Sequence, residues 1–312
     1  MSKKEEVEYE EYENLKNSKF KQQKMAGWRP VPSMARTVVI FFVLGIVFVG
    51  LGVLILLFSN EIVEKIQKYD CETNICTIEI KIEKEMKKNI MVYYQLDGFY
   101  QNHRRYVKSK SIKQLNGSFI SKEEMSKSQD CDPVVTNEDM GQSNSIENTS
   151  LVKDEVAIPC GLMAKHYFND NFTKWTITNS NPKREIIVNT KNISRKSDRN
   201  KFRNQNKTKQ WLDIEDEHFI VWMRPAPLPN FTKLWGRIEE DIEKDSTLEV
   251  VIENNYNVTP FNGSKYLVLR TVNNFGGNNI YLAIGYIAFG GVCLILGIIF
   301  FIGYKAHQKK EK

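Results

Sequence analysis

The sequence has few of the residues that hold catalytic metals, with four His and five Cys among 312 residues. These residues show neither the H-E-x-x-H nor the C-x-x-C…H spacing of familiar zinc sites. Walker A, Rossmann and G-x-S-x-G patterns are also missing, so neither a nucleotide-binding loop nor a nucleophile elbow is predicted. We therefore expect no metal, no cofactor and no catalytic residues, and the chain is not predicted to be an enzyme.

Charge is missing from two long stretches of the chain. Residues 38–58 and residues 280–302 contain no Asp, Glu, Lys, Arg or His. At a rise of ~1.5 Å per residue, a helix over either stretch can cross a hydrocarbon core of ~30 Å. The absence of ionisable groups argues against an ion-coupled transporter that works alone. The sequence therefore predicts an integral membrane protein with two transmembrane helices.

The charges beside these stretches indicate the orientation of the chain. Basic residues precede the first stretch and follow the second: Lys21, Lys24, Arg29, Arg36, Lys305, Lys309, Lys310 and Lys312. Positive charge favours the cytosolic side, so both termini are expected there. The predicted order is a cytosolic tail over 1–37 with a basic pre-membrane segment at 20–33, a span at 38–58, a lumenal or extracellular ectodomain at 59–279, a span at 280–303 and a basic cytosolic tail at 304–312.

The predicted ectodomain contains four cysteines and eight N-x-S/T sequons. An even number of cysteines in an oxidising compartment suggests two disulfides, and of three possible pairings proximity favours Cys71–Cys76 and Cys131–Cys160. Asn230 has a competing role, because it stands where the N-cap of a following helix is expected. Seven sequons are predicted as glycosylation sites: Asn116, Asn148, Asn171, Asn192, Asn206, Asn257 and Asn262.

Apolar patterns predict a β-rich ectodomain. Alternation predicts strands at 78–82, 90–94, 219–223, 248–252 and 266–272, and helical spacing predicts helices at 96–107 and 231–242. The polar segment 121–155 is expected to be an inserted loop. The basic residues 182–209, which include the segment 182–196, do not indicate a nucleic-acid partner, because they are predicted to be lumenal. The expected fold is a membrane protein in which two transmembrane α-helices flank one large antiparallel, β-sandwich-like α+β ectodomain.

Several blocks of sequence resemble one family. They are FKQQKMAGWRPVPS from Phe20, YYQLDGFYQNHRRYVKSKSIKQLNG from Tyr93, PCGLMAKHYFNDNF from Pro159, EHFIVWMRPAPLPNFTKLWGRIEEDI from Glu217 and FGGNNIYLAIGYI from Phe275, with a looser match in SDRNKFRN from Ser197. On the two-span topology these blocks resemble the cell-division-control / ligand-effect-modulator family. Its members are the non-catalytic (beta) subunits of type IV P-type ATPases, the phospholipid flippases.

The resemblance implies a heterodimer with a type IV P-type ATPase catalytic subunit in a membrane whose phospholipids the ATPase moves. It implies a role in the assembly of the ATPase, its exit from the endoplasmic reticulum and its catalytic cycle. The implied locations are the endoplasmic reticulum, the Golgi or endosomes, and the plasma membrane. The residues we single out for partner binding are Phe20, Trp28, Arg29, Trp222, Arg224 and Trp235. The alternative is a self-standing two-span glycosylated receptor or ligand-gated channel.

Overall fold

The computed structural model describes residues 12–13, 15–25, 27, 33–178, 183–273 and 276–310. These residues fall into two compact units. One unit contains most of the two long helices, and the other spans Ile55–Ile280.

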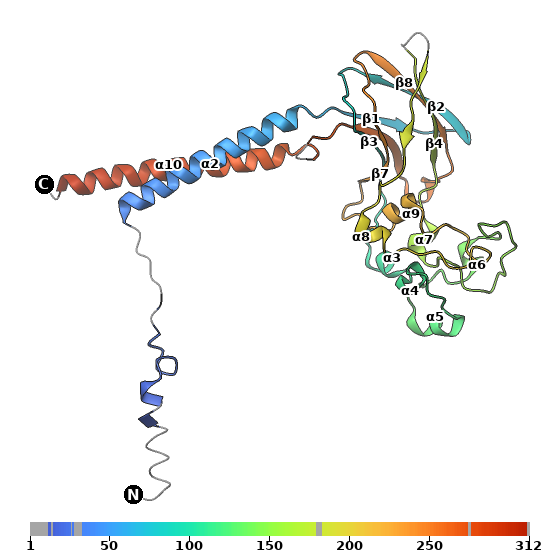
Figure 1. The fold of residues 1–312 in the computed structure, drawn as a ribbon, viewed down its shortest axis with the longest axis horizontal. Coiled ribbons are helices and arrows are strands. Elements are labelled where there is room, and N and C mark those ends of the chain that lie inside the picture. The colour runs from blue at the N-terminus through green and yellow to red at the C-terminus, as the bar shows by residue number, and fades with distance from the viewer. Residues whose placement is uncertain are drawn as a thin grey trace, which may run out of the picture. The chain divides into compact units, whose positions relative to one another are not determined.

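Most of the helices α2 (Met34–Asn60) and α10 (Ile280–Lys310) belongs to the first unit, α2 up to Leu54 and α10 from Tyr281 (Figure 1). Both are long and apolar enough to cross a membrane. Only 17% of the most apolar stretch of α2 is buried, and 22% of that of α10. The core helix of a soluble protein is mostly buried, whereas these helices expose apolar side chains such as Ile46 and Ile295. The predicted pair of membrane-spanning helices is confirmed.

Two antiparallel sheets form the second unit, the ectodomain. The first sheet has the strand order β1 (Glu64–Tyr69), β9 (Ser264–Arg270), β3 (Ile90–Asp97), β7 (Phe231–Ile238) and β6 (Val188–Asn189). The second has the order β2 (Ile75–Ile82), β8 (Ser246–Glu253), β4 (Asn171–Ile177) and β5 (Arg184–Glu185). The β-rich antiparallel ectodomain is therefore confirmed, and the strands predicted at 78–82, 90–94 and 248–252 lie within β2, β3 and β8.

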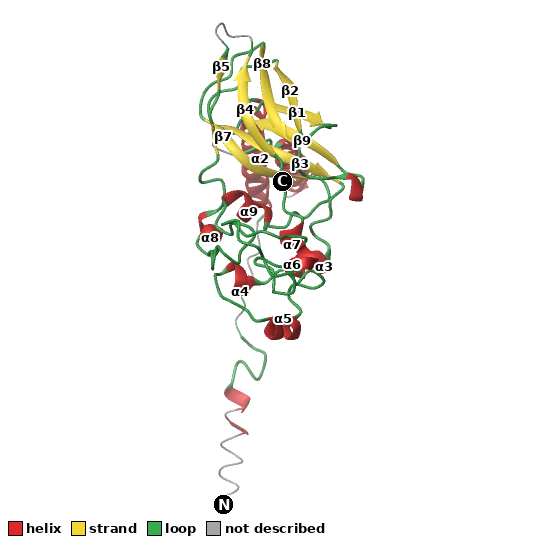
Figure 2. Ribbon diagram, turned by 90° about the vertical axis from the view of Figure 1, so that its right-hand side faces the viewer, coloured by secondary structure: helices red, strands yellow, loops and turns green. Residues whose placement is uncertain are grey.

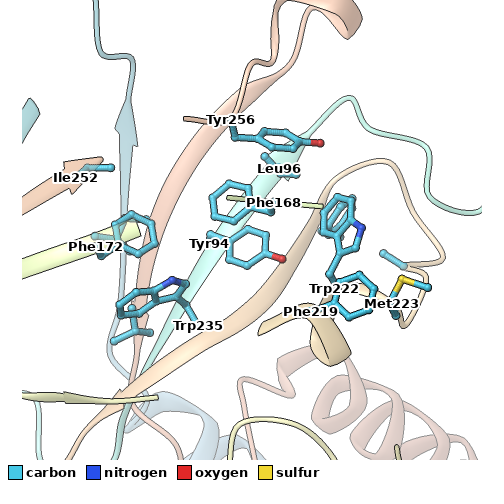
Figure 3. Close-up of a cluster of buried hydrophobic side chains, with 14 of the residues drawn as sticks. Tyr94, Leu96, Phe168, Phe172, Phe219, Trp222, Met223, Trp235, Ile252 and Tyr256 are labelled. Carbon is cyan, nitrogen blue, oxygen red and sulfur yellow. The ribbon is translucent and has the colours of Figure 1, made fainter. Parts of the chain in front are cut away.

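Alternating side chains from the two sheets build the core. Every second residue of β3 and of β8 is buried, as expected for strands with one covered face. Aromatic rings join the sheets: Phe172 on β4 contacts Trp235 on β7, with ring centroids 5.0 Å apart. Tyr94 stacks on Phe168 at 3.8 Å (Figure 3). Large aromatic rings therefore join aliphatic side chains in filling the space between the sheets.

Short helices occupy the other end of the ectodomain, away from the strands (Figure 2). They are α3 (Arg104–Lys108), α4 (Ile112–Leu115), α5 (Lys122–Ser128), α6 (Asn137–Met140), α7 (Leu162–Lys165), α8 (Lys196–Arg199) and α9 (Glu217–Trp222), with the 3-10 helix η1 at Thr259–Phe261. Disulfides join Cys71 to Cys76 and Cys131 to Cys160, the pairing favoured by proximity.

The segment 121–155, expected to be a loop, has a core of its own. It contains α5 and α6, and it buries Met125, Met140 and Leu151. Both helices begin at a side-chain cap: Ser121 caps α5 and Thr136 caps α6, the latter in a capping box with Asp139. Few apolar residues are enough here, because caps and the Cys131–Cys160 bond supply the remaining order.

The helix predicted over 231–242 is wrong, since residues 231–238 form strand β7. The register of β7 against β3 shifts next to Trp235, so a β-bulge inserts one extra residue. The buried positions run Phe231, Lys233 and Trp235 in steps of two, and then Gly236 and Ile238, so the alternation shifts by one residue at the bulge. That shift puts Trp235 and Ile238 three residues apart, as in the apparent helical spacing of the sequence.

The strand predicted over 219–223 is also wrong, because this segment lies in and just beyond helix α9. The Asp216 side chain caps the helix by accepting a hydrogen bond from the backbone N–H of His218 at 3.2 Å. Phe219, Ile220 and Trp222 are all buried, so apolar and polar residues do not alternate with the 3.6-residue period that would have predicted a helix here.

The helix predicted over 96–107 is shorter than expected, and Asn230 has a different role. Strand β3 continues to Asp97, and Gly98, with a φ of +83°, ends it, so the helical turn α3 begins only at Arg104. Asn230 does not cap a helix, because a strand follows it. Its Oδ1 accepts a hydrogen bond from the N–H of Gly98 at 3.1 Å.

Candidate partner-binding surfaces

Small residues bring the two spanning helices into close contact. A Cβ added to Gly290 would lie 2.8 Å from the backbone nitrogen of Val49, and one added to Gly45 would lie 3.1 Å from the carbonyl oxygen of Gly290. Gly52 approaches the carbonyl oxygen of Ala283 in the same way, at 3.0 Å. Close backbone approach of this kind is how helices pack in lipid. Gly45, Gly52 and Gly290 therefore hold α2 against α10.

Trp222 and Trp235, both proposed for partner binding, belong to the core of the ectodomain (Figure 3). Trp222 has no exposed surface, and its indole N–H donates to the carbonyl oxygen of Met163 at 2.7 Å. Trp235 is 7% exposed and packs on Phe172. A partner cannot reach either ring in this fold, so we correct that expectation: both residues shape the ectodomain instead of contacting a partner.

Hydrogen bonds between loops join two of the blocks that resemble the family, the block from Tyr93 and the block from Glu217. The side chain of Gln101 accepts a hydrogen bond from the N–H of Ala226 at 2.9 Å. The Asn102 amide donates to the carbonyl oxygen of Pro227 at 2.8 Å, and the N–H of Phe99 donates to that of Pro229 at 3.1 Å. The proline-rich segment cannot join a sheet, because proline lacks the N–H donor. These side-chain and loop bonds fix its path instead.

This loop contact leaves three large side chains at the surface. Tyr100 and Leu228 are 62% and 63% exposed, and Arg224 is exposed beside Asp198, with its Nη2 3.6 Å from Oδ2. We call Tyr100, Arg224 and Leu228 the motif-loop surface. Exposed aromatic, apolar and arginine side chains are the types enriched at protein interfaces. The sequence indicated Arg224 but missed the other two, since only the fold distinguishes them from buried neighbours.

A buried lysine, Lys233, hydrogen-bonds the backbone that leads to Arg224 of the motif-loop surface. Lys233 on β7 donates to the carbonyl oxygens of Val221 at 3.2 Å and Trp222 at 3.4 Å, and also to that of Arg224. These are carbonyl groups at the end of α9, which need donors from outside the helix. Burial, with the nearby charge of Arg224, lowers the pKa of Lys233 to about 7.

The pre-membrane segment is described only in part. Phe20 is 77% exposed, in keeping with a side chain that is free to meet a partner or a lipid surface. Trp28 and Arg29, the two other residues proposed there, lie outside the described residues.

The sequon asparagines and the possible metal ligands can also be placed. All seven asparagines proposed as glycosylation sites are exposed. Asn171 and Asn192 use their side chains in hydrogen bonds, with Glu253 at 3.2 Å and Arg199 at 2.5 Å. Among the described residues, no group of three or more His, Cys, Asp or Glu could hold a metal ion.

Known proteins match this chain over most of its length. Residues 2–310 match the model of the LEM3 (ligand-effect modulator 3) family / CDC50 family. ALA-interacting subunit 3 of Arabidopsis thaliana is 37% identical, over 95% of this chain and 87% of its own length. Cell cycle control protein 50A of Bos taurus is 31% identical, over 92% of this chain and 88% of its own length.

A third relative is more distant. The phospholipid-transporting ATPase accessory subunit CDC50 of Chaetomium thermophilum is 25% identical, over 92% of this chain and 86% of its own length. The fold and its surfaces thus define a two-span membrane protein with a large β-rich ectodomain. The chain belongs to the LEM3/CDC50 family.

Proposed function

We propose that this chain is the accessory subunit of a phospholipid-transporting type IV P-type ATPase, with which it forms a heterodimer. The observation that carries the proposal is the family match over residues 2–310, together with relatives named as an ATPase accessory subunit and as an interacting subunit. In this account the ATPase hydrolyses ATP and moves the lipid. This chain contributes binding surfaces and no catalytic group.

Three parts of the chain support such a role: the two helices, the motif-loop surface and the pre-membrane segment. The helices α2 and α10 pack together through Gly45 and Gly290 while exposing apolar surface outward, which further membrane helices can cover. The motif-loop surface offers Tyr100, Arg224 and Leu228 to a lumenal or extracellular loop. The segment 20–33, with Phe20 exposed, is suited to the cytosolic side of a partner or to anionic lipid.

The proposed role also implies how the chain is oriented in the membrane and through which compartments it passes. Both termini are cytosolic, and the ectodomain, with its two disulfides and exposed sequons, matures in the endoplasmic reticulum. The pair then leaves for the Golgi, endosomes or plasma membrane. A self-standing receptor or channel has less support, because the relatives are named for subunits that accompany another protein.

Transport of a labelled phospholipid tests this function. Cells that lack the chain are expected to lose inward movement of a fluorescent phospholipid and to retain the ATPase in the endoplasmic reticulum. Re-expression of the chain restores both. Normal transport and normal ATPase location without the chain would contradict the proposal.

A further inference from the structure

A cavity of about 810 Å³ opens at the helical end of the ectodomain, beside α3 and α7. Cavities of ~300–1,000 Å³ are typical of sites for small ligands. Its walls are mostly apolar and aromatic, and they include Phe99, Tyr106, Leu162, His166 and Phe261. The cavity shares Tyr100 with the motif-loop surface, but neither Arg224 nor Leu228 nor any residue of α2 or α10 lines it.

Phe99 is at the centre of the aromatic wall. Its ring lies 5.5 Å from that of Tyr106, 5.1 Å from that of Phe261 and 6.1 Å from that of His166, measured between centroids. All three contacts are edge-to-face, an arrangement that fixes the orientation of the rings. A hydrocarbon chain would find a preformed apolar surface here.

Two buried polar atoms in the wall have unused hydrogen-bonding capacity. They are the hydroxyl of Tyr106, a residue only 8% exposed, and Nδ1 of His166. The indole of Trp222 lies beside the hydroxyl, but its N–H is taken by the carbonyl oxygen of Met163. Burial raises the pKa of Tyr106, so the hydroxyl keeps its proton and can donate it in a hydrogen bond. Both atoms are shielded from solvent, so the rings of Tyr106 and His166, and not these two atoms, line the cavity.

Positive charge lies at the rim of the same cavity. Arg105 and Lys108 are exposed there, and in the described part of the chain neither forms an ion pair with a carboxylate. One acid, Asp132, also lines the cavity. An unpaired guanidinium and an unpaired ammonium beside an apolar wall suit a carboxylate or phosphate.

A second cavity of about 350 Å³ provides the contrast. It also has apolar walls and two lysines, but Lys122 is paired with Asp154, and Lys209 with Glu155 at 3.3 Å. Its cations are therefore neutralised within the chain. The larger cavity, in contrast, combines an aromatic wall with two cations that form no ion pair among the described residues.

We propose that the larger cavity binds a single-chain anionic amphiphile, with one hydrocarbon chain against Phe99 and Phe261 and a carboxylate or phosphate headgroup at Arg105 and Lys108. The rings of Tyr106 and His166 complete the wall beside the chain. This site does not depend on the proposed function, since it needs neither the ATPase nor lipid transport.

Photolabelling of the full chain tests the site. The chain is placed in nanodiscs of phosphatidylcholine, exposed to a diazirine-bearing palmitic acid and irradiated, and the labelled peptides are mapped by mass spectrometry. Label is expected on residues 99–109 and 162–166. Unlabelled palmitate and lysophosphatidic acid are expected to compete, whereas inorganic phosphate and a neutral monoacylglycerol are not.

Charge reversal at the rim gives the sharpest comparison. Arg105→Glu combined with Lys108→Glu is expected to reduce labelling of these peptides roughly tenfold or more, because the headgroup contacts are lost. Leu162→Trp, which fills the cavity, should do the same without changing charge. Lys122→Glu combined with Lys209→Glu is the matched control and should leave labelling unchanged.

Four results would overturn the proposal. They are labelling confined to α2 and α10, labelling unaffected by charge reversal at the rim, full competition by inorganic phosphate, which would indicate an anion site only, and loss of labelling in complexes purified from native membranes. The last result would mean that a protein segment fills the cavity. Comparison of wild type and variants by glycosylation pattern and elution volume keeps misfolding separate from loss of binding.

Discussion

Lys265 and Asp170 form an ion pair inside the ectodomain: Nζ lies 2.6 Å from Oδ2, and the two side chains are 5% and 0% exposed. The pair joins β9 of one sheet to the segment that leads into β4 of the other. Asp170 also accepts hydrogen bonds from the hydroxyl of Tyr69 at 2.9 Å and from the backbone N–H groups of Asn255 and Tyr256. A buried carboxylate is acceptable here because every neighbour donates to it.

Breaking this pair from one side should be costly. Lys265→Met leaves the carboxylate buried without its cation, and the expected loss is about 3–5 kcal/mol of unfolding free energy. The double variant Lys265→Met with Asp170→Asn, which removes both charges, should be more stable than Lys265→Met alone. Urea unfolding of the purified chain, followed by tryptophan fluorescence, measures both. Equal stability of the single and double variants would contradict the account.

Gly161 occupies a backbone conformation that other residues avoid. Its φ is +99°, and an added Cβ would lie 2.2 Å from the carbonyl oxygen of Ser109. Gly161→Ala should therefore cost more than ~4 kcal/mol, because both the backbone and its neighbour must move. Gly141→Ala is the control: φ is +77° there, but nothing lies within 4 Å, so about 1–2 kcal/mol is expected. Similar losses at the two positions would show that the close contact is wrong.

The close contact of Gly290 with α2 predicts that valine will have different effects at Gly290 and at the adjacent Gly291. Gly290→Val should push α10 away from Val49 on α2 and cost about 1–3 kcal/mol, whereas Gly291→Val faces open space. Spin labels at Gly50→Cys and Gly285→Cys, both with no atoms nearby, report the separation of the helices. The label distance should lengthen with Gly290→Val only. Lengthening with both valines, or with neither, would refute the packing.

Lys233 predicts a pH dependence of stability. Its pKa in the folded chain is lowered by burial to about 7, against ~10.4 in the unfolded chain. Between these pH values the unfolded chain binds a proton that the folded chain does not, so stability rises as the pH increases. Below pH ~7 the lysine is charged in both states, and its burial cost is fully present.

Comparison of wild type with Lys233→Met isolates this effect. The stability of wild type relative to Lys233→Met should increase between pH 7 and pH 9, measured as the urea midpoint. Lys174→Met, at an exposed position on β4, serves as the control and should run parallel to wild type. Parallel curves for Lys233→Met and wild type would mean that Lys233 does not titrate in this range.

The motif-loop surface predicts loss of the partner without loss of the fold. Tyr100→Ala combined with Leu228→Asp should reduce recovery of the ATPase with this chain roughly thirtyfold or more, since exposed anchors contribute about 1–2 kcal/mol each. Phe119→Asp changes an equally exposed aromatic residue elsewhere on the ectodomain and is the control. Co-immunoprecipitation measures the recovery. Equal recovery from both variants would place the interface on another surface.

Much of the fold could be predicted because its signals are local. The spans follow from two uncharged stretches, and strands such as β2 and β8 follow from strict alternation of apolar residues. The errors came where a local signal was ambiguous. The bulge at Trp235 made strand β7 resemble a helix, and the buried helix α9 has no polar face.

The candidate surfaces were harder to predict, because burial depends on the whole fold. Trp222 and Trp235 stand in the most family-like block, yet both are core residues, while Tyr100 and Leu228 are exposed. The pairing of Asp170 with Lys265, 95 positions apart, has no counterpart in the local pattern. Sequence could propose the class of protein, but only the fold separates structural from accessible residues.

Affinity purification of this chain from native membranes in mild detergent, followed by mass spectrometry, tests the central claim most directly. The account predicts a type IV P-type ATPase in roughly one-to-one amount with the chain. Recovery of the chain alone, as a stable homo-oligomer without an ATPase, would contradict it and favour a self-standing receptor or channel.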